Sequence, residues 1–169
     1  MSNGTNPVRR IRVSLAVFIA GLVASGITAG PLETELGWLV SMLRTPAVMP
    51  MAQATGLLSW IEFVYDAVRT TNATYPILAY GTDWLMFAHL AIAVAFVGPW
   101  IDPVRNKWVI EFGLIACAAV VPWALVMGGI RGIPLPWRLV DCSFGVFGAV
   151  PLAFSIRWIR RLEESIVRV

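Results

Sequence analysis

Four long apolar runs dominate the chain, and each has about the 20 residues that an α-helix needs to cross the hydrocarbon of a bilayer. The four runs cover residues 12–30, 80–100, 108–128 and 137–158. Glycine and proline punctuate the turns between them, as at Gly30-Pro31 and in the short segment from Gly132 to Pro136. The pattern predicts an all-α integral membrane protein, a single domain over residues 1–169 built as a bundle of four transmembrane helices.

The segment from residue 31 to 79 has a different pattern, with shorter apolar pieces broken by Pro46 and Pro50. Over residues 52–68 the apolar side chains recur at helical spacing on one side, and polar or charged ones occupy the other. The apolar side has Leu57, Ile61, Val64, Tyr65 and Val68, and the polar side has Ser59, Glu62, Asp66 and Arg69. This predicts an amphipathic helix that lies on the membrane, packs over the bundle, or crosses it.

Composition and charge choose between four and five spans. The chain is 58% hydrophobic and 14% charged, so its net charge of +3 indicates membrane topology and no nucleic-acid binding. Four spans place nine basic residues on the N-terminal side and four opposite, which obeys the positive-inside tendency, whereas five spans give six against seven. The nine are Arg9, Arg10, Arg12, Arg105, Lys107, Arg157, Arg160, Arg161 and Arg168.

We therefore expect four spans with both termini in the cytoplasm, and the setting that fits is a bacterial inner membrane. Residues 31–79 then form a long outer loop that carries amphipathic helical segments. The first run also has the basic start and the small residues of a signal peptide, but we expect it to be retained as a span.

Charged residues near the outer ends of the predicted spans form the first candidate site. Asp83 and Asp141 lie about one turn inside their spans, and Arg131 and Arg138 flank the last hairpin. Charges inside a span cost ~3 kcal/mol or more at its centre, so they usually face one another or a watery cavity. Two interpretations follow. The four residues form a salt-bridge latch, or they line a pocket in which the arginines hold a carboxylate or phosphate headgroup.

The deeper part of the same predicted pocket contains His89, the only histidine, together with Trp84 and Trp123. At mid-membrane depth a neutral imidazole with a partner is cheaper than a cation. No cofactor is expected from this arrangement, and a haem iron on His89 is the alternative. The two cysteines are far apart and no metal-ligand spacing occurs, so no metal site is expected.

The leading functional interpretation is a non-catalytic membrane protein that binds an amphiphilic small molecule or lipid in a pocket open to the outer leaflet. One alternative is an accessory subunit of a larger membrane complex. Another is an intramembrane enzyme that uses His89 and the acids on a lipid-like substrate. Small residues at helical spacing also allow a homo-oligomer to form through close helix contact. They are Gly21, Ser25, Gly26 and Gly30 in the first span, or Gly145 and Gly148 in the fourth.

Overall fold

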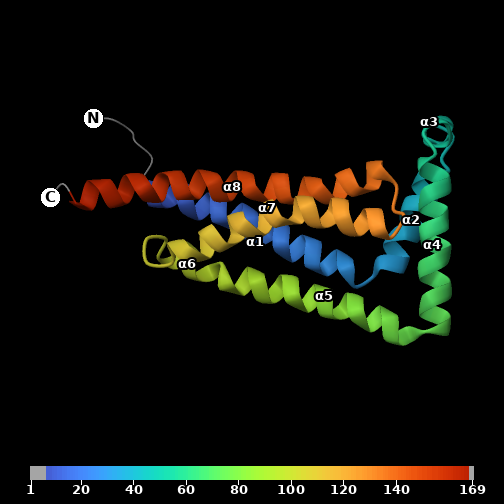
Figure 1. Ribbon diagram of the computed structural model, residues 1–169, viewed down its shortest axis with the longest axis horizontal. Helices are drawn as coiled ribbons and strands as arrows, with labels where there is room; N and C mark the ends of the chain where they lie inside the picture. The colour runs from blue at the N-terminus through green and yellow to red at the C-terminus, as the bar shows by residue number, and fades with distance from the viewer. Residues whose placement is uncertain (1–6, 168–169) are drawn as a thin grey trace. The chain divides into compact units, whose positions relative to one another are not determined.

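The computed structural model describes residues 7–167, with side chains described to residue 164, and these residues form helices and no strand (Figure 1). The helices are α1 (Pro7–Ala29), α2 (Leu32–Leu43), α3 (Met49–Ala54), α4 (Leu57–Thr74), α5 (Pro76–Ala95), α6 (Val97–Ile101), α7 (Lys107–Ile130) and α8 (Leu135–Val167). The all-α prediction is confirmed. Arg168, one of the nine basic residues in the charge count, lies outside the described residues.

Four helical stretches of the described chain are long and apolar enough to cross a membrane, which confirms the four-span prediction. They are Pro7–Ala29, Pro76–Ile101, Lys107–Ile130 and Leu135–Glu164. They begin between one and five residues earlier than the apolar runs alone predict. In α1 the early start takes in Arg9, Arg10 and Arg12, and in α8 it takes in Pro136, because proline is tolerated in the first turn of a helix. The chain is an integral membrane protein.

The chain contains two compact units. Unit 1 comprises the described residues up to Leu22 and from Ile92 onward, and unit 2 comprises Val23–Ala91. Helices α1 and α5 each contribute residues to both units.

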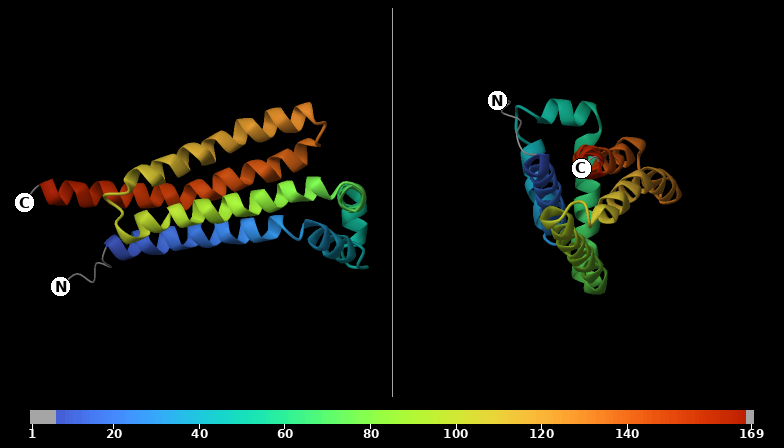
Figure 2. Two further views of the ribbon diagram at one scale, coloured as in Figure 1. Left: turned by 90° about the horizontal axis from the view of Figure 1, so that it is seen from below. Right: turned by 90° about the vertical axis from the view of Figure 1, so that its left-hand side faces the viewer.

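Unit 1 is organised around α7 and α8, which form an antiparallel pair and lie side by side in Figures 1 and 2. Close approach is possible because Gly145 of α8 lies against the backbone carbonyl of Cys117 on α7, where a Cβ atom would collide. Membrane helices associate through such small residues, since lipid tails give no hydrophobic drive. The buried cluster of this unit is Ile11, Leu15, Phe18, Phe96, Val109, Ile110, Leu152, Ile156 and Ile159.

Unit 2 holds the three helices of the predicted outer loop, and α2 packs against α4. Its buried side chains are Leu36, Val40 and Leu43 from α2, Ala52 from α3, and Leu58 and Ile61 from α4. An ion pair and a side-chain hydrogen bond supplement this small core. Arg44 pairs with Glu62 at 2.7 Å, and the Asn72 side-chain amide donates to the Glu33 carboxylate at 2.9 Å.

The amphipathic helix predicted over residues 52–68 differs in its bounds. The structure breaks it at Thr55 and Gly56, where Gly56 adopts a left-handed φ of 71° that favours glycine. Helix α4 then begins at Leu57 and continues to Thr74, six residues beyond the predicted end at residue 68.

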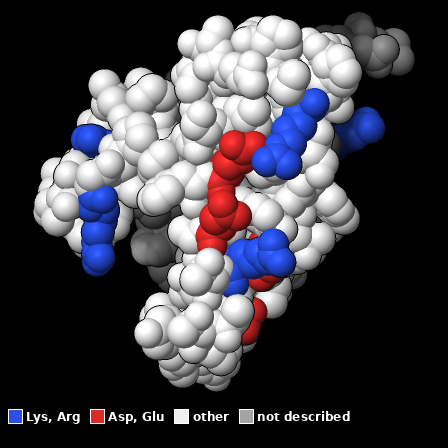
Figure 3. Space-filling model, turned by 90° about the vertical axis from the view of Figure 1, so that its right-hand side faces the viewer, with Lys and Arg blue, Asp and Glu red and all other residues white. Residues whose placement is uncertain are grey.

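Helix α4 is amphipathic. It is absent from the stretches that are apolar enough to cross a membrane, and within unit 2 it runs crosswise to α5 (Figures 1 and 2). Its exposed side carries Asp66 and Arg69, with Glu62 half-buried one turn earlier. The space-filling view in Figure 3 shows acidic side chains in a band with basic side chains beside them and uncharged residues around them. A helix with one apolar and one charged side is suited to the interface between lipid and water.

Candidate functional site

A pocket of ≈ 250 Å³ lies within unit 2, where α4 faces the start of α5 and the junction between α1 and α2. Ten residues line it: Gly30, Leu32, Ala67, Val68, Thr71, Asn72, Leu78, Ala79, Thr82 and Asp83. The volume is just below the range of pockets that bind drug-sized ligands, so it is large enough for a headgroup or a small ring.

Helical spacing explains why these residues converge. On α4, Val68, Thr71 and Asn72 stand three and four residues apart and therefore share one face. On α5, Leu78 and Thr82 form one such pair and Ala79 and Asp83 form another. Each helix thus contributes an apolar part and a polar part to the same pocket.

The polar groups of the pocket are mainly hydrogen-bond acceptors. The Thr82 hydroxyl donates to the Ala79 carbonyl at 2.7 Å, so its oxygen is left with accepting capacity. The Asn72 amide donates to Glu33, which leaves its carbonyl oxygen to accept. Asp83 adds a carboxylate, and no lysine, arginine or histidine is among the described residues that line the pocket. Such a lining suits an ammonium or hydroxyl group better than an anion.

Of the seven residues that the sequence indicated as a site, Asp83 is the one that lines this pocket. The neighbouring Trp84 belongs to an aromatic ladder along α5, in edge-to-face contact with Tyr80 at 6.0 Å and with Phe87 at 5.6 Å between ring centroids. Its side chain is 56% exposed. Trp84 therefore offers an aromatic surface on the outside of the helix, beside the pocket residue.

His89 lies deeper in α5 and packs against α1. A Cβ atom placed on Gly26 of α1 would lie only 2.8 Å from the His89 Cβ, so the close contact of the two helices requires glycine at this position. The ring nitrogen Nδ1 is 2.8 Å from the Leu85 carbonyl oxygen, a contact that requires the proton on Nδ1 and leaves Nε2 able to accept or to bind a metal. Within the described chain no group of three or more His, Cys, Asp or Glu side chains could hold a metal ion. Haem ligation by His89 stays a prediction.

Arg138 of unit 1 binds the backbone of its own hairpin. Its Nε donates to the Ile133 carbonyl at 2.6 Å, and its side chain packs on Gly128, where a Cβ would lie 2.7 Å from the arginine Cδ. A longer contact of 3.5 Å runs from Nη1 to the Leu125 carbonyl. Arg138 therefore fixes the turn between α7 and α8.

The other predicted residues of unit 1 lie apart from this arrangement. Asp141 is half-buried and, in the part of the chain that the structure describes, forms no ion pair with Arg138, so a latch between these two side chains is not formed. Arg131 is exposed at the end of α7, and Trp123 is 69% exposed on the same helix. A ligand-contacting role for Arg131, Arg138, Asp141 and Trp123 stays a prediction.

The sequence did not indicate the other nine lining residues as site residues, and three of these nine are polar: Thr71, Asn72 and Thr82. The amphipathic pattern was followed only to Val68, although its apolar side continues one helical turn further to Thr71 and Asn72. Extending the same face would have placed both beside Val68. Thr82 precedes Asp83 and would have marked a polar pair at the start of the span.

The small residues proposed for self-association mostly serve contacts within the chain. Gly30 meets Met86 Sδ at 3.2 Å from its would-be Cβ, and Gly148 meets Cys117 Sγ at 3.0 Å. Gly26 packs against His89 and Gly145 against the Cys117 carbonyl, as described above. Gly21 differs, because nothing lies within 4 Å of a Cβ placed there. Homo-oligomer formation through these residues stays a prediction, and Gly21 is the position with open space for a partner helix.

Comparisons of this chain with known protein families, with curated proteins and with solved structures find no match.

Proposed function

We propose that this membrane protein binds an amphiphilic small molecule or lipid in the pocket of unit 2. The observation that carries the proposal is the combination in one pocket of an apolar wall, formed by Leu32, Val68 and Leu78, with the acceptor groups of Asn72, Thr82 and Asp83. An amphiphile is the class of ligand that satisfies both parts. Ligand sites in proteins commonly have this composition, a mostly apolar lining with a few convergent polar groups.

The proposed headgroup is a hydrogen-bond donor, best an ammonium. The pocket presents a carboxylate and neutral oxygens, and a cation beside Asp83 gains a charge-assisted hydrogen bond, which is about twice as strong as a neutral one. This chemistry replaces the carboxylate or phosphate headgroup that the sequence suggested, because Arg138 is engaged with the backbone of its own hairpin.

The pocket is suited to a ligand held at the level of the lipid headgroups. One of its walls is the amphipathic helix α4, and the opposite wall is the first turns of the spanning helix α5. The polar end of an amphiphile would meet water there, while its apolar body would enter the bilayer beside α5.

The proposed setting is a bacterial inner membrane with both termini in the cytoplasm, so that the pocket faces the outer leaflet. Support comes from the excess of basic residues on the side of the termini, nine against four. A fluorescent protein fused to the C-terminus tests this orientation. Fluorescence is expected, because the fusion folds in the cytoplasm, and a dark fusion with active alkaline phosphatase at the same position would contradict it.

Binding is tested with three probes that share one alkyl chain: dodecylamine, dodecanol and dodecanoate. The purified full chain is reconstituted in phosphatidylcholine nanodiscs, and the thermal unfolding temperature is measured at rising probe concentration, since a bound ligand stabilises the folded state. We expect dodecylamine to stabilise most, dodecanol less and dodecanoate least. Equal stabilisation by the amine and the carboxylate would overturn the proposed headgroup chemistry.

Two variants tie the probe to the pocket. Asp83→Asn removes the carboxylate and is expected to weaken dodecylamine binding about tenfold, the loss of a charge-assisted hydrogen bond, while dodecanol binding changes little. Asp66→Asn, on the exposed side of α4, is the matched control and should bind both probes as the wild type does. Leu78→Trp fills the pocket and should abolish binding of all probes. Retained binding in Leu78→Trp would remove the pocket from the proposal.

The haem alternative has its own test. A visible spectrum of the gently purified protein shows a strong band near the blue end if haem is bound, and that band should disappear in His89→Phe. A spectrum without this band would remove haem from consideration, and native mass spectrometry of the same sample would identify a retained lipid or a partner subunit.

A further inference from the structure

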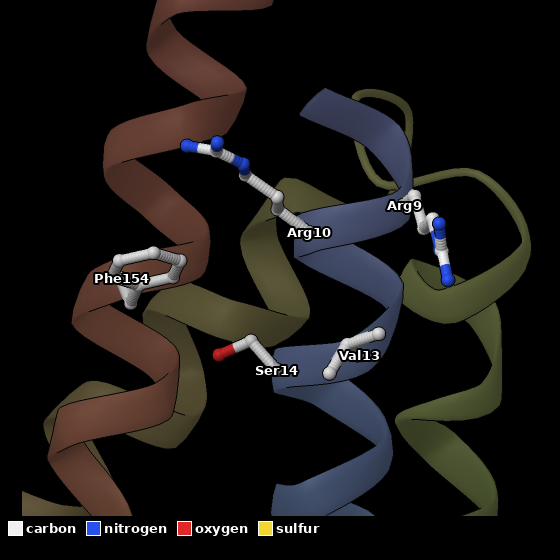
Figure 4. Close-up of a pocket in the computed structure, with 5 residues that line it drawn as sticks. All are labelled: Arg9, Arg10, Val13, Ser14 and Phe154. Atoms are coloured by element: carbon white, nitrogen blue, oxygen red, sulfur yellow. The ribbon is translucent and has the colours of Figure 1, made fainter. Parts of the chain in front are cut away.

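A second concavity lies in unit 1, between the first turns of α1 and the later part of α8 (Figure 4). Its volume is ≈ 580 Å³, and it is lined by Arg9, Arg10, Val13, Ser14 and Phe154. Figure 4 shows Arg10 and Ser14 extending from α1 toward α8, whereas Arg9 and Val13 project from the other side of α1. The groove is separate in composition from the pocket of unit 2 and shares no residue with it.

Positive charge is concentrated at one end of this groove. The Arg10 guanidinium lies over the Trp158 ring at 4.7 Å from its centroid, and the Arg161 guanidinium lies over the same ring at 4.8 Å. Cation–π contact orients both groups but leaves their charge in place. Arg9, Arg157 and Arg160 are exposed on the same two helices. An anion at this end would meet guanidinium groups from both helices.

The other end of the groove is apolar. Val13 lies one turn further into α1 than Arg9 and is 58% exposed, and Phe154 lies one turn further into α8 than Trp158 and is 46% exposed. Phe154 and Trp158 form a tilted ring pair with centroids 6.1 Å apart. The Ser14 hydroxyl donates to the Pro151 carbonyl at 2.8 Å and joins the two helices within the groove. The charged end of the groove and its apolar end are therefore separated by only one helical turn, about 6 Å.

We propose that this groove binds a phospholipid whose headgroup carries a net negative charge. The phosphate lies at the basic end of the groove, which Arg9 and Arg10 line from the two sides of α1, and an acyl chain lies along the apolar end at Val13 and Phe154. Basic pockets between transmembrane helices are a known form of site for anionic headgroups. A soluble anion would use only the arginine end, whereas a lipid uses the whole groove, including the exposed apolar side chains that belong to a spanning segment. The proposal does not depend on the function proposed for the pocket of unit 2.

The experiment is native mass spectrometry of the full chain, released from nanodiscs that contain equal amounts of phosphatidylglycerol and phosphatidylcholine with matched acyl chains. We expect wild-type protein to retain phosphatidylglycerol in preference to phosphatidylcholine. The double variant Arg9→Gln, Arg10→Gln should lower phosphatidylglycerol retention by about 25-fold, since each basic residue near an anionic membrane surface contributes about fivefold. Arg69→Gln, Arg131→Gln is the control with the same change of net charge and should retain the lipid. Unchanged retention in the Arg9, Arg10 variant would overturn the proposal.

A second variant pair separates a lipid in the groove from a general attraction to charge. Val13→Trp fills the apolar half without changing charge and should also lower phosphatidylglycerol retention, whereas Val146→Trp, at another exposed position of α8, should not. Loss in the arginine variant together with full retention in Val13→Trp would overturn the groove as the site. Displacement of the lipid by free glycerol phosphate would show that the headgroup alone binds and would overturn the lipid assignment. If the arginine variant does not fold, as judged by circular dichroism, Val13→Trp decides the question.

Discussion

The two units of the chain bring helices together by different means. In unit 1, α7 and α8 approach through glycine, with Gly145 against the backbone of Cys117. A buried cluster of aliphatic and phenylalanine side chains joins them to α1 and to Phe96, the residue before α6. In unit 2, α2 and α4 share only a few buried side chains and are tied by the pairs Arg44–Glu62 and Glu33–Asn72. The glycine contact of unit 1 suits spanning helices, because helices within lipid gain little from burying apolar surface and associate through close approach of their backbones.

Polar side chains behave alike in the two units except at the pocket. Backbone carbonyls accept hydrogen bonds from Ser14 and Arg138 in unit 1 and from Ser41 and Thr82 in unit 2. Each unit also has a side-chain ion pair, Lys107–Glu163 in unit 1 and Arg44–Glu62 in unit 2. Unit 2 differs in its pocket, where Asn72, Thr82 and Asp83 present acceptor oxygens together.

The largest expected effect is that of Gly145→Leu. The new side chain would collide with the Cys117 carbonyl, and a backbone atom cannot move aside as a flexible side chain can. Overpacking typically costs about 1–3 kcal/mol, and a backbone collision belongs at or above the top of that range. We expect little folded protein in gel filtration and a strongly lowered unfolding temperature. Gly21→Leu is the control, since nothing lies within 4 Å of its Cβ. Equal behaviour of the two variants would contradict glycine-mediated packing of unit 1.

An intermediate effect is expected for Arg138→Ala. The change removes the hydrogen bond to the Ile133 carbonyl and the packing on Gly128. Hydrogen bonds from charged groups contribute about 1.5–3 kcal/mol, so the unfolding temperature should fall clearly while dodecylamine binding stays at the wild-type level. Arg131→Ala is the matched control and should change neither quantity. Loss of probe binding in Arg138→Ala without loss of stability would instead support the ligand-contacting role predicted from the sequence.

The smallest effect is expected for Arg44→Ala in unit 2. The pair with Glu62 is short, at 2.7 Å, but the arginine side chain is 62% exposed, and exposed ion pairs typically contribute about 0–1 kcal/mol. Thermal unfolding at low and high salt measures the contribution, which should shrink as salt screens the charges. A large loss of stability that salt does not alter would mean that the ion pair, and not the apolar face of α4, holds this unit together.

The four spans and the helical class of the protein follow from the sequence, because length and apolarity are local properties of each segment. The sequence also predicts the amphipathic character of α4, although it places the end of this helix near Val68, whereas the helix ends at Thr74. The break at Gly56 was not predicted, since a single glycine inside a helical pattern marks either a weak point or a left-handed turn, and the flanking residues do not distinguish them.

Depth along a span can be counted from the sequence, which places Asp83 about one turn inside its span. Because α5 begins at Pro76, Asp83 lies about two turns inside the helix. The contacts of a side chain cannot be predicted from its position in the sequence. Arg138 and Asp141 are three residues apart and suggest an ion pair, yet the arginine turns back to the Ile133 carbonyl, which its own hairpin presents at 2.6 Å. In the same way, the tertiary structure alone brings Thr71 and Asn72 of α4 to Asp83 of α5 and creates the pocket. Sequence determines which segments enter the membrane because that depends on transfer of each segment into lipid. Contacts between segments depend on helix rotation and turn geometry, which only the folded chain decides.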